Sequence, residues 1–268
     1  MLTPYVQLTT ITSLIRVAPA EMLGGVFIRY VLRTTDLESA RTFYADAIGL
    51  ALPSGSSAES ALEAWPLHER ARANGAPAHW LGQLAVDDVE SAVARLVERG
   101  STRLGPTVDA SDHVRFATLR DPSGAVIAIR SGAAPASDRP VAWHQLHTSD
   151  LDTAWKLYSE LFGWTHLDTI DVPDPPGGHR VFSWAAGGTP VGSMANTARW
   201  PGVHPHWAFY LHLPVADIES ATARVRAQGG TAMDVIALPN GTRLAPCEDP
   251  QGAAFGLVGP AARRDSRD

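Results

Sequence analysis

Two short runs of the chain carry aromatic or polar side chains at every second position. Trp143, Gln145 and His147 alternate along one run, and Tyr210 and His212 alternate along another. Because a β-strand places residues two apart on the same face, each set would project from one side of a strand. Aromatic walls with a few placed polar groups are typical of a pocket for a flat organic molecule. These five side chains are therefore candidate ligand-binding residues.

A second candidate group is charged. Arg29 and Arg33 share one face of an earlier run, with Val31 between them. A charge inside a sheet-lined cavity is costly unless it is paired or hydrated, so we expect Arg29 to pair with Glu63 on a facing strand. Alternatively, Arg33 or both arginines bind the carboxylate or phosphate of a substrate, which suits the planar guanidinium group.

The remaining histidines and the cysteine give weaker signals. His79 and His206 precede strands near prolines, so we expect them at the surface or in packing. Cys247 precedes Glu248 and Asp249, whose negative charges would raise the pKa of the thiol. We therefore do not expect a nucleophilic cysteine.

The elements that must position these residues occur more than once. Three kinds of segment each appear twice: an aspartate followed thirteen residues later by a glycine, a shorter version with twelve residues, and an Asp-Pro-x-Gly turn. The pairs are 36–49 with 150–163, 88–100 with 217–229, and 121–124 with 249–252. An internal repeat of this kind indicates two copies of one domain.

The four aspartates that precede a glycine by twelve or thirteen residues are each expected to begin a helix. Thr35 or Asp36 would cap the first one, and apolar residues then recur at three- and four-residue intervals, with a glycine at the end. Short strands should precede the helices at 26–33, 80–86, 142–147 and 207–213, and further strands should follow at 179–185, 190–194, 242–247 and 253–258. The repeating unit is thus a strand, a helix, and two or three strands.

Composition limits the function classes. The 268 residues are 45% hydrophobic and 19% charged, which fits two ordinary domains. A net charge of −6, with no basic cluster outside the tail at Arg263 and Arg264, argues against nucleic acid as a partner. No apolar run is long enough for a membrane span, and a single cysteine fits the cytoplasm.

The expected organisation has five parts. They are an N-terminal extension (1–25), a first domain (26–132), a linker (133–140), a second domain (141–260) and a C-terminal tail (261–268). The extension lacks the basic start and cleavage pattern of a signal peptide, so we expect either a disordered extension or a misassigned start before Met22.

The repeated strand, Asp-Leu helix start and aromatic pair, together with the Asp-Pro-x-Gly turns, resemble the vicinal oxygen chelate superfamily. That superfamily includes glyoxalase I, extradiol dioxygenases, and fosfomycin and bleomycin resistance proteins. The run from Trp143 to Asp150 is similar to a hallmark of a tandem two-domain glyoxalase-like group. The resemblance implies an α+β fold in which four βαβββ units pair into two tandem cup-shaped domains.

The resemblance also implies a divalent metal in each cup, held by one residue from each of four strands. Carried onto this chain, those positions are Arg29, Glu63, Leu81 and Ala128 in the first domain, and Trp143, Gly192 or its neighbour, Tyr210 and Gly256 in the second. Only Glu63 is a normal ligand, so we expect no metal and no other cofactor. A displaced metal site of Gln145, His147 and His212 remains an alternative.

Three functional hypotheses follow. The first is a bleomycin-resistance-like protein that binds a small aromatic molecule, as a monomer or homodimer, with the better site in the second cup. There Gly192 and Gly256 would leave space in the floor, and residues 171–178 would form a rim. The second is an isomerase, hydroxylase, lyase or dioxygenase acting on a specialised metabolite, with His147 or His212 as general base. The third is a pair of filled cups that serve as a partner interface.

Overall fold

The computed structural model of the chain describes residues 25–53, 60–110, 114–134, 140–173, 176–213, 217–237 and 242–259. The expected N-terminal extension, linker and C-terminal tail lie wholly or mostly outside these ranges. No helix in the described ranges is long and apolar enough to cross a membrane.

The four aspartates predicted to begin helices each cap one, as the sequence predicts. The side chain of each one accepts a hydrogen bond from the backbone N–H three residues further along, which satisfies an otherwise unpaired donor of the first turn. Asp36 rather than Thr35 is the first cap. The capped helices are α1 (Leu37–Ile48), α3 (Val89–Glu98), α4 (Leu151–Phe162) and α5 (Ile218–Ala227). Gly49 and Gly163 end two of them with φ values of 71° and 74°, a conformation that glycine adopts without strain.

The first repeat forms one curled sheet. Among the described residues it has seven strands in the order β2-β1-β3-β7-β6-β4, with β5 beside β6. Their bounds are β1 (Phe27–Thr34), β2 (Leu62–Pro66), β3 (His79–Ala85), β4 (Thr102–Arg103), β5 (Val108–Asp109), β6 (Arg115–Arg120) and β7 (Val126–Arg130). The first unit departs from the expected pattern, because a short helix, α2 (Glu69–Ala73), follows β2 where a further strand was expected.

The second repeat forms a sheet of nine strands within the described ranges, in the order β13-β15-β16-β12-β8-β11-β10-β9, with β14 beside β15. Their bounds are β8 (Val141–His147), β9 (Thr165–Pro173), β10 (Pro176–Ser183), β11 (Gly192–Ala195), β12 (His206–His212), β13 (Thr231–Ala232), β14 (Ile236–Ala237), β15 (Arg243–Glu248) and β16 (Ala254–Gly259). A 3-10 helix, η1 (Asn196–Arg199), follows β11. Residues 171–178 were expected to be a loop, but most of them belong to the hairpin of β9 and β10.

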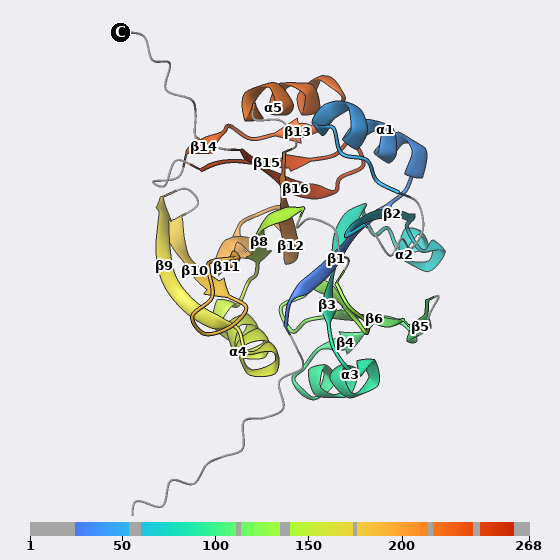
Figure 1. Cartoon of the computed structure of the whole chain (residues 1–268), viewed down its shortest axis with the longest axis vertical. Helices are drawn as coiled ribbons and strands as arrows, with labels where there is room; N and C mark the ends of the chain where they lie inside the picture. Colours follow the sequence, from blue (N-terminus) through green and yellow to red (C-terminus); the bar gives the residue numbers. More distant parts are fainter. Residues whose placement is uncertain are drawn as a thin grey trace, which may run out of the picture.

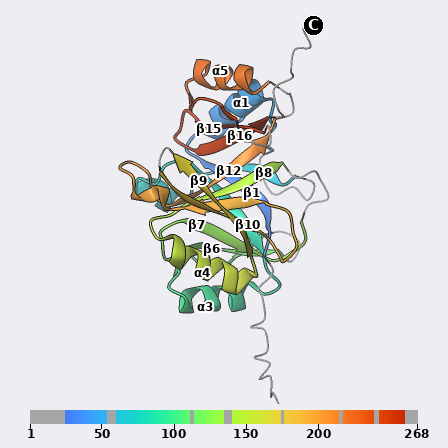
Figure 2. The same cartoon turned by 90° about the vertical axis from the view of Figure 1, so that its left-hand side faces the viewer.

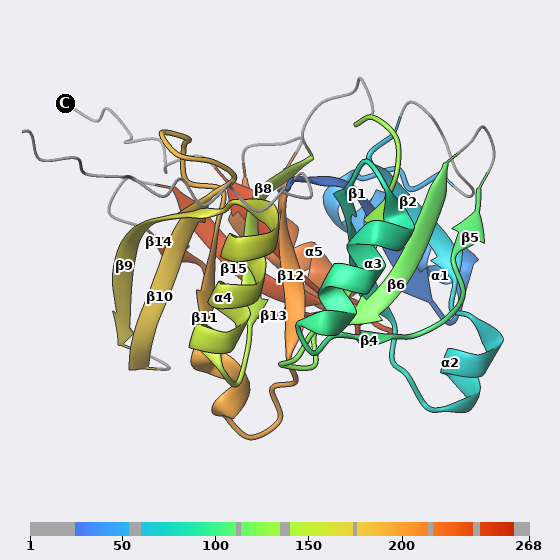
Figure 3. The same cartoon turned by 90° about the horizontal axis from the view of Figure 1, so that it is seen from below.

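Helices of one repeat lie beside helices of the other. Helix α1 lies next to α5 (Figure 1), where Arg224 Nε donates a hydrogen bond to the carbonyl of Ala47 over 2.8 Å. At the opposite end α3 lies next to α4 (Figure 2 and Figure 3), where Arg99 and Glu160 form an ion pair at 2.9 Å. The two repeats therefore associate through their helical, convex sides and leave the concave face of each sheet for other contacts.

Two buried hydrogen bonds cross between the repeats. The hydroxyl of Tyr44 donates to Asp249 over 3.3 Å, and that of Tyr158 donates to Asp121 over 3.0 Å. Both tyrosines are 0% exposed. They occupy the same place in their helices, and both acceptors are the aspartates of the Asp-Pro-x-Gly turns. The interface thus uses one contact twice, in opposite directions.

Each of these tyrosines also accepts a hydrogen bond. Trp80 Nε1 donates to the Tyr44 hydroxyl over 2.9 Å, and Trp207 Nε1 donates to the Tyr158 hydroxyl over 3.1 Å. Asp121 in turn accepts bonds from backbone N–H groups of its own turn. Each hydroxyl is therefore used as both donor and acceptor, which removes the cost of burying it.

A third contact lies where the two sheets meet. His144 Nδ1 lies 2.8 Å from the carbonyl of Val191, so this nitrogen carries the proton and Nε2 is left to accept a bond from the Tyr30 hydroxyl at 2.7 Å. Burial lowers the pKa of His144 to about 4, which keeps the ring neutral as this arrangement requires. Phe27 stacks on His144 with ring centroids 5.3 Å apart.

Removing one crossing hydroxyl should destabilise the whole chain. Tyr158→Phe leaves a carboxylate oxygen of Asp121 and the indole N–H of Trp207 without this partner, so we expect a loss of about 1–3 kcal/mol in the free energy of unfolding. Urea unfolding measures it. Tyr210→Phe is the matched control, because the structure gives its hydroxyl no partner among the described residues. Equal effects of both substitutions would contradict the assigned role of the crossing bonds.

Candidate functional site

The concave face of the first sheet contains the expected ion pair. Arg29 on β1 and Glu63 on β2 are 3% and 0% exposed, and Arg29 Nη1 contacts Glu63 Oε1. The same nitrogen donates to the carbonyl of Ser60 over 2.9 Å. Burial, with a further contribution from the charge of Arg130, lowers the pKa of Arg29 to about 10. At neutral pH Arg29 therefore remains protonated.

Arg33 does not join that pair. Its guanidinium lies over the ring of Trp65, 5.4 Å from the centroid. Trp65 on β2 in turn approaches Phe116 on β6 with centroids 6.0 Å apart, although three strands separate β2 from β6 in the sheet. The sheet therefore curls until these rings meet across its concave face, and side chains of the chain itself occupy much of the first cup.

Two further polar residues of the first cup, Arg130 and Gln83, were not among the sequence-predicted candidates. Arg130 on β7 is 5% exposed and donates to Gln83 Oε1 on β3 over 3.3 Å. Arg130 follows Ala128 by two residues, so strand alternation places both on the concave face. Arg130 was therefore predictable as the next residue after Ala128 on the same face of the strand.

The concave face of the second sheet contains a directional chain of hydrogen bonds. Trp143 Nε1 donates to Ser193 Oγ over 3.3 Å, and Ser193 Oγ donates to Gln145 Oε1 over 2.8 Å. The amide nitrogen of Gln145 lies 3.1 Å from His179 Nδ1, which must accept because the amide nitrogen can only donate. His179 therefore carries its proton on Nε2. This series of hydrogen bonds fixes the orientation of the predicted residues Trp143 and Gln145. It also includes Ser193 and His179, which were not among the sequence-predicted candidates.

Two further histidines stack in the same cup. His147 lies parallel to His206 with ring centroids 4.6 Å apart, and His147 Nδ1 lies 2.6 Å from Thr197 Oγ1. Burial, with smaller effects of His206 and His179, lowers the pKa of His147 to about 3. Burial also lowers the pKa values of His206 and His179. His206, expected at the surface or in packing, packs on the ring of His147, its strand partner on β8.

His212 does not share a site with His147. Strand β12 runs antiparallel to β8, so His206 is the partner of His147, whereas the backbone N–H of His212 bonds to the carbonyl of Pro140. Six residues of strand separate His206 from His212, which corresponds to about 20 Å. His212 is exposed at the far end of the strand. The displaced site of Gln145, His147 and His212 is therefore not assembled.

The expected space in the floor of the second cup is also filled. A side chain at Gly256 would collide with the ring of Tyr210, which lies across that glycine, and one at Gly192 would collide with the carbonyl of His144 and with Phe182. Tyr210 is nearly buried, and burial, followed by the effect of Cys247, raises the pKa of its hydroxyl to about 12. The small residues accommodate protein atoms and do not create ligand space.

Open space lies instead beside the cup, between β10 and η1. A pocket of about 580 Å³ is lined by Leu151, Thr169, Gly177, Gly178, His179, Arg180, Ala195, Asn196, Thr197, Arg199 and Trp200. Two of these residues belong to the polar networks of the cup, since His179 bonds to Gln145 and Thr197 bonds to His147. The pocket therefore adjoins the predicted residues at the edge of the second cup.

Comparison with known families agrees with this architecture. A family model described as "Glyoxalase-like domain" matches residues 29–129, and one described as "Glyoxalase/Bleomycin resistance protein/Dioxygenase superfamily" matches residues 141–257. The chain belongs to this superfamily, with two such domains in tandem. The predicted fold and family are thus confirmed.

Two relatives of this glyoxalase-superfamily chain cover most of its length. "Putative glyoxylase CFP32" of Mycobacterium bovis is 28% identical over 252 residues, which is 87% of this chain and 94% of the relative. "Anthracycline biosynthesis protein DauV" of a Streptomyces species is 29% identical over 194 residues, covering 69% of this chain and 67% of the relative. The first is named as a glyoxylase and the second for anthracycline biosynthesis.

Solved structures share the fold at lower identity. The Mn(II)-bound glyoxalase from Novosphingobium aromaticivorans has a TM-score of 0.60 at 13% identity and covers 88% of this chain and 82% of its own. A catechol 2,3-dioxygenase has a TM-score of 0.60 at 14% identity, with 92% and 93% covered. These likenesses establish the fold of this superfamily member.

The residues at the superfamily's metal positions do not fit a divalent cation. In the first cup Glu63 is already paired with Arg29, and Leu81 and Ala128 have no donor atoms. In the second cup the corresponding positions are Trp143 on β8, Tyr210 on β12 and Gly256 on β16, which adjoin one another in the sheet. They supply an indole, a protonated phenol and no side chain. Within the described ranges, no three or more His, Cys, Asp or Glu side chains are grouped so that they could hold a metal ion.

Metal content is a direct test of this donor set. We expect the purified protein to contain far less than one Zn, Ni, Mn or Fe per chain, and added Mn²⁺ or Zn²⁺ should not raise its melting temperature. Elemental analysis and thermal unfolding measure these two properties. One metal per chain that is lost in His147→Ala would show that the histidines of the second cup bind it.

The ion pair in the first cup gives a second prediction. Glu63→Ala strands the buried charge of Arg29 and should cost about 1–4 kcal/mol of unfolding free energy, whereas adding Arg29→Met should recover much of that loss. Denaturant unfolding of the two single variants and the double variant completes the cycle. The exposed pair Arg115 and Asp109 is the matched control and should give a coupling below about 1 kcal/mol. Additive effects at Arg29 and Glu63 would refute the coupling.

Proposed function

We propose that the chain is a small-molecule-binding member of the superfamily, and that its second cup binds a planar aromatic compound without the usual metal. The observation that carries this proposal is the hydrogen-bond chain from Trp143 through Ser193 and Gln145 to His179, which ends at an open pocket. Such a chain holds an aromatic wall and its polar neighbours in fixed orientations before a ligand arrives. Preorganisation of this kind reduces the entropy lost on binding.

The available polar atoms indicate the chemistry of the ligand. His179 Nε2 carries a proton, and the Tyr210 hydroxyl stays protonated because its pKa is raised to about 12, so both are donors. A complementary ligand presents acceptor oxygens such as ring carbonyl or hydroxyl groups. The indole of Trp143 supplies an aromatic surface for the ring. The relative named for anthracycline biosynthesis supports the choice of a fused-ring compound as a probe.

His147 and His179 are poorly suited to proton transfer. A general base works best when its pKa is near the working pH, whereas the pKa of His147 is lowered to about 3. His179 uses Nδ1 as an acceptor for Gln145, so this nitrogen is not available to a substrate. These observations favour binding over the enzymatic alternative. A cytoplasmic location and a monomeric or homodimeric state remain predictions.

Calorimetry with daunorubicin tests the proposal. We expect micromolar binding to the wild-type protein, and at least about tenfold weaker binding to Trp143→Leu and to Gln145→Leu. Trp143→Leu removes the aromatic wall, while Gln145→Leu breaks the hydrogen-bond chain. Thermal unfolding verifies that each variant is folded, and hexanol serves as the aliphatic comparison compound.

Arg33→Ala is the matched control, because Arg33 lies in the first cup over Trp65. It should bind daunorubicin as the wild type does. Affinity that survives both second-cup substitutions but is lost in Arg33→Ala would assign ligand binding to the first cup. Equal affinity of all variants would show that the binding is non-specific.

A further inference from the structure

The first cup contains more buried positive than negative charge among the described residues. Arg29 and Arg130 are 3% and 5% exposed, whereas Glu63, at 0%, is the buried carboxylate that faces them. Glu63 contacts Arg29. Arg130 bonds to the neutral amide of Gln83, and no described carboxylate forms an ion pair with it. A buried guanidinium without a counter-charge is energetically costly, so its presence needs a reason.

The surroundings of Arg130 offer donors. The indole Nε1 of Trp65 is buried and has no acceptor among the described residues. Trp65 packs against Phe116, and Phe116 is the direct strand partner of Arg130. The pKa of Arg130 is lowered by burial, and Arg130 in turn lowers the pKa of Arg29, as expected where opposite charge is insufficient. The first cup therefore contains a buried indole N–H without a described acceptor and a guanidinium whose described acceptor is a neutral amide.

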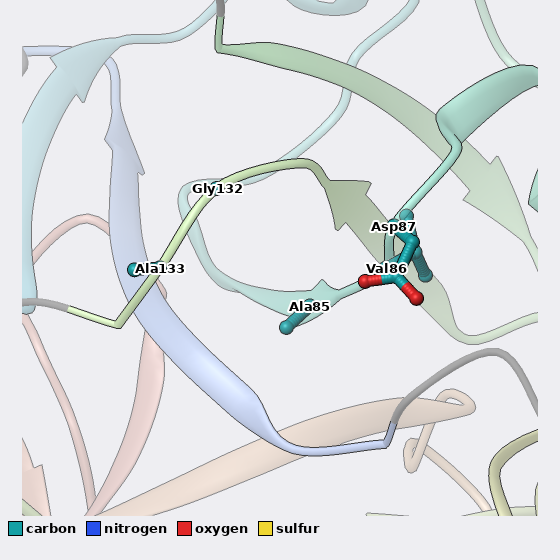
Figure 4. A pocket seen from close by; sticks show the side chains of 5 residues that line it. All are labelled: Ala85, Val86, Asp87, Gly132 and Ala133. Atoms are coloured by element: carbon teal, nitrogen blue, oxygen red, sulfur yellow. The ribbon is translucent and has the colours of Figure 1, made fainter.

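A pocket lies at the end of β3, next to the strand position of Arg130. A pocket of about 400 Å³ is lined by Ala85, Val86, Asp87, Gly132 and Ala133 (Figure 4). Ala85 follows Gln83 by two residues on β3, and strand pairing places it beside Arg130. Asp87, the one charged side chain of this pocket, is exposed at its edge. The pocket thus reaches Ala85, the strand partner of Arg130.

We infer that the first cup binds a small oxyanion, either a carboxylate or an inorganic anion, at the Arg130 guanidinium beside Gln83, with access past Ala85. The planar guanidinium group binds two oxygens of such an anion at once. The bound charge would offset the excess positive charge of Arg29 and Arg130. This site is separate from the aromatic site of the second cup, and each can be tested without the other.

Thermal unfolding in sodium phosphate and in sodium acetate tests the inference, with sodium chloride keeping the ionic strength constant. At least one anion should raise the melting temperature with a saturable dependence, and the better anion shows whether the site suits an inorganic or a carboxylate group. Arg130→Gln should weaken the apparent affinity at least about tenfold. Ala85→Glu, which places a carboxylate beside Arg130, should do the same by occupying the site from within. Lys156→Gln on the exposed face of α4 is the matched control and should behave as the wild type does.

Ala85→Glu also keeps the test decisive if Arg130→Gln fails to fold. A saturable response that persists unchanged in Ala85→Glu would refute the site. So would a response in the wild type that never saturates, or one that Lys156→Gln loses as fully as the two cup variants do. No response to either anion would equally refute it.

Discussion

The association of the two repeats depends on a pair of buried tyrosine-to-aspartate hydrogen bonds. Tyr44 reaches Asp249 and Tyr158 reaches Asp121, so the turn of each repeat is fixed by a helix of the other. Each aspartate also shapes its own turn by accepting backbone N–H groups. Because the same carboxylate serves the turn and the interface, the convex sides of both sheets are tightly constrained. The concave sides carry no such requirement, and their residues are free to differ.

The two cups show how far that freedom extends. The first contains charge: Arg29 with Glu63, Arg130 with Gln83, and Arg33 over an indole ring. The second contains neutral groups, a hydrogen-bond chain from Trp143 to His179 and a histidine stack. One backbone thus presents a cationic interior and an uncharged polar interior within a single chain. At the superfamily's metal positions the residues of both cups fit a divalent cation poorly, because Glu63 is already paired with Arg29 in the first cup and the second cup has an indole, a phenol and a glycine there.

Local features of this fold were predictable from sequence, and contacts between distant strands were not. The aspartate caps, the apolar helix faces and most strands depend on neighbouring residues, and the structure confirms them. The ion pair of Arg29 with Glu63 was also predictable, because a buried charge requires a partner. The contacts of His179 with Gln145 and of His206 with His147 were not predicted, because strand register sets them. The space expected at Gly256 was wrong because Tyr210, from the adjacent strand, fills it. Residues 171–178 were misread because strand pairing overrides their proline and glycine content.

The contact of Tyr30 with His144 has a consequence for which domains can associate. The two residues stand at equivalent places, each six positions before its helix cap, yet one donates and the other accepts. Two first domains would oppose tyrosine to tyrosine, and two second domains would oppose two acceptor nitrogens, since each ring already gives its proton to a carbonyl. The pairing of a first with a second domain supplies one donor and one acceptor at this contact. Two second domains would leave both ring nitrogens without a donor at this position, whereas a first domain beside a second satisfies both groups, so this single contact favours the association of the two unlike domains.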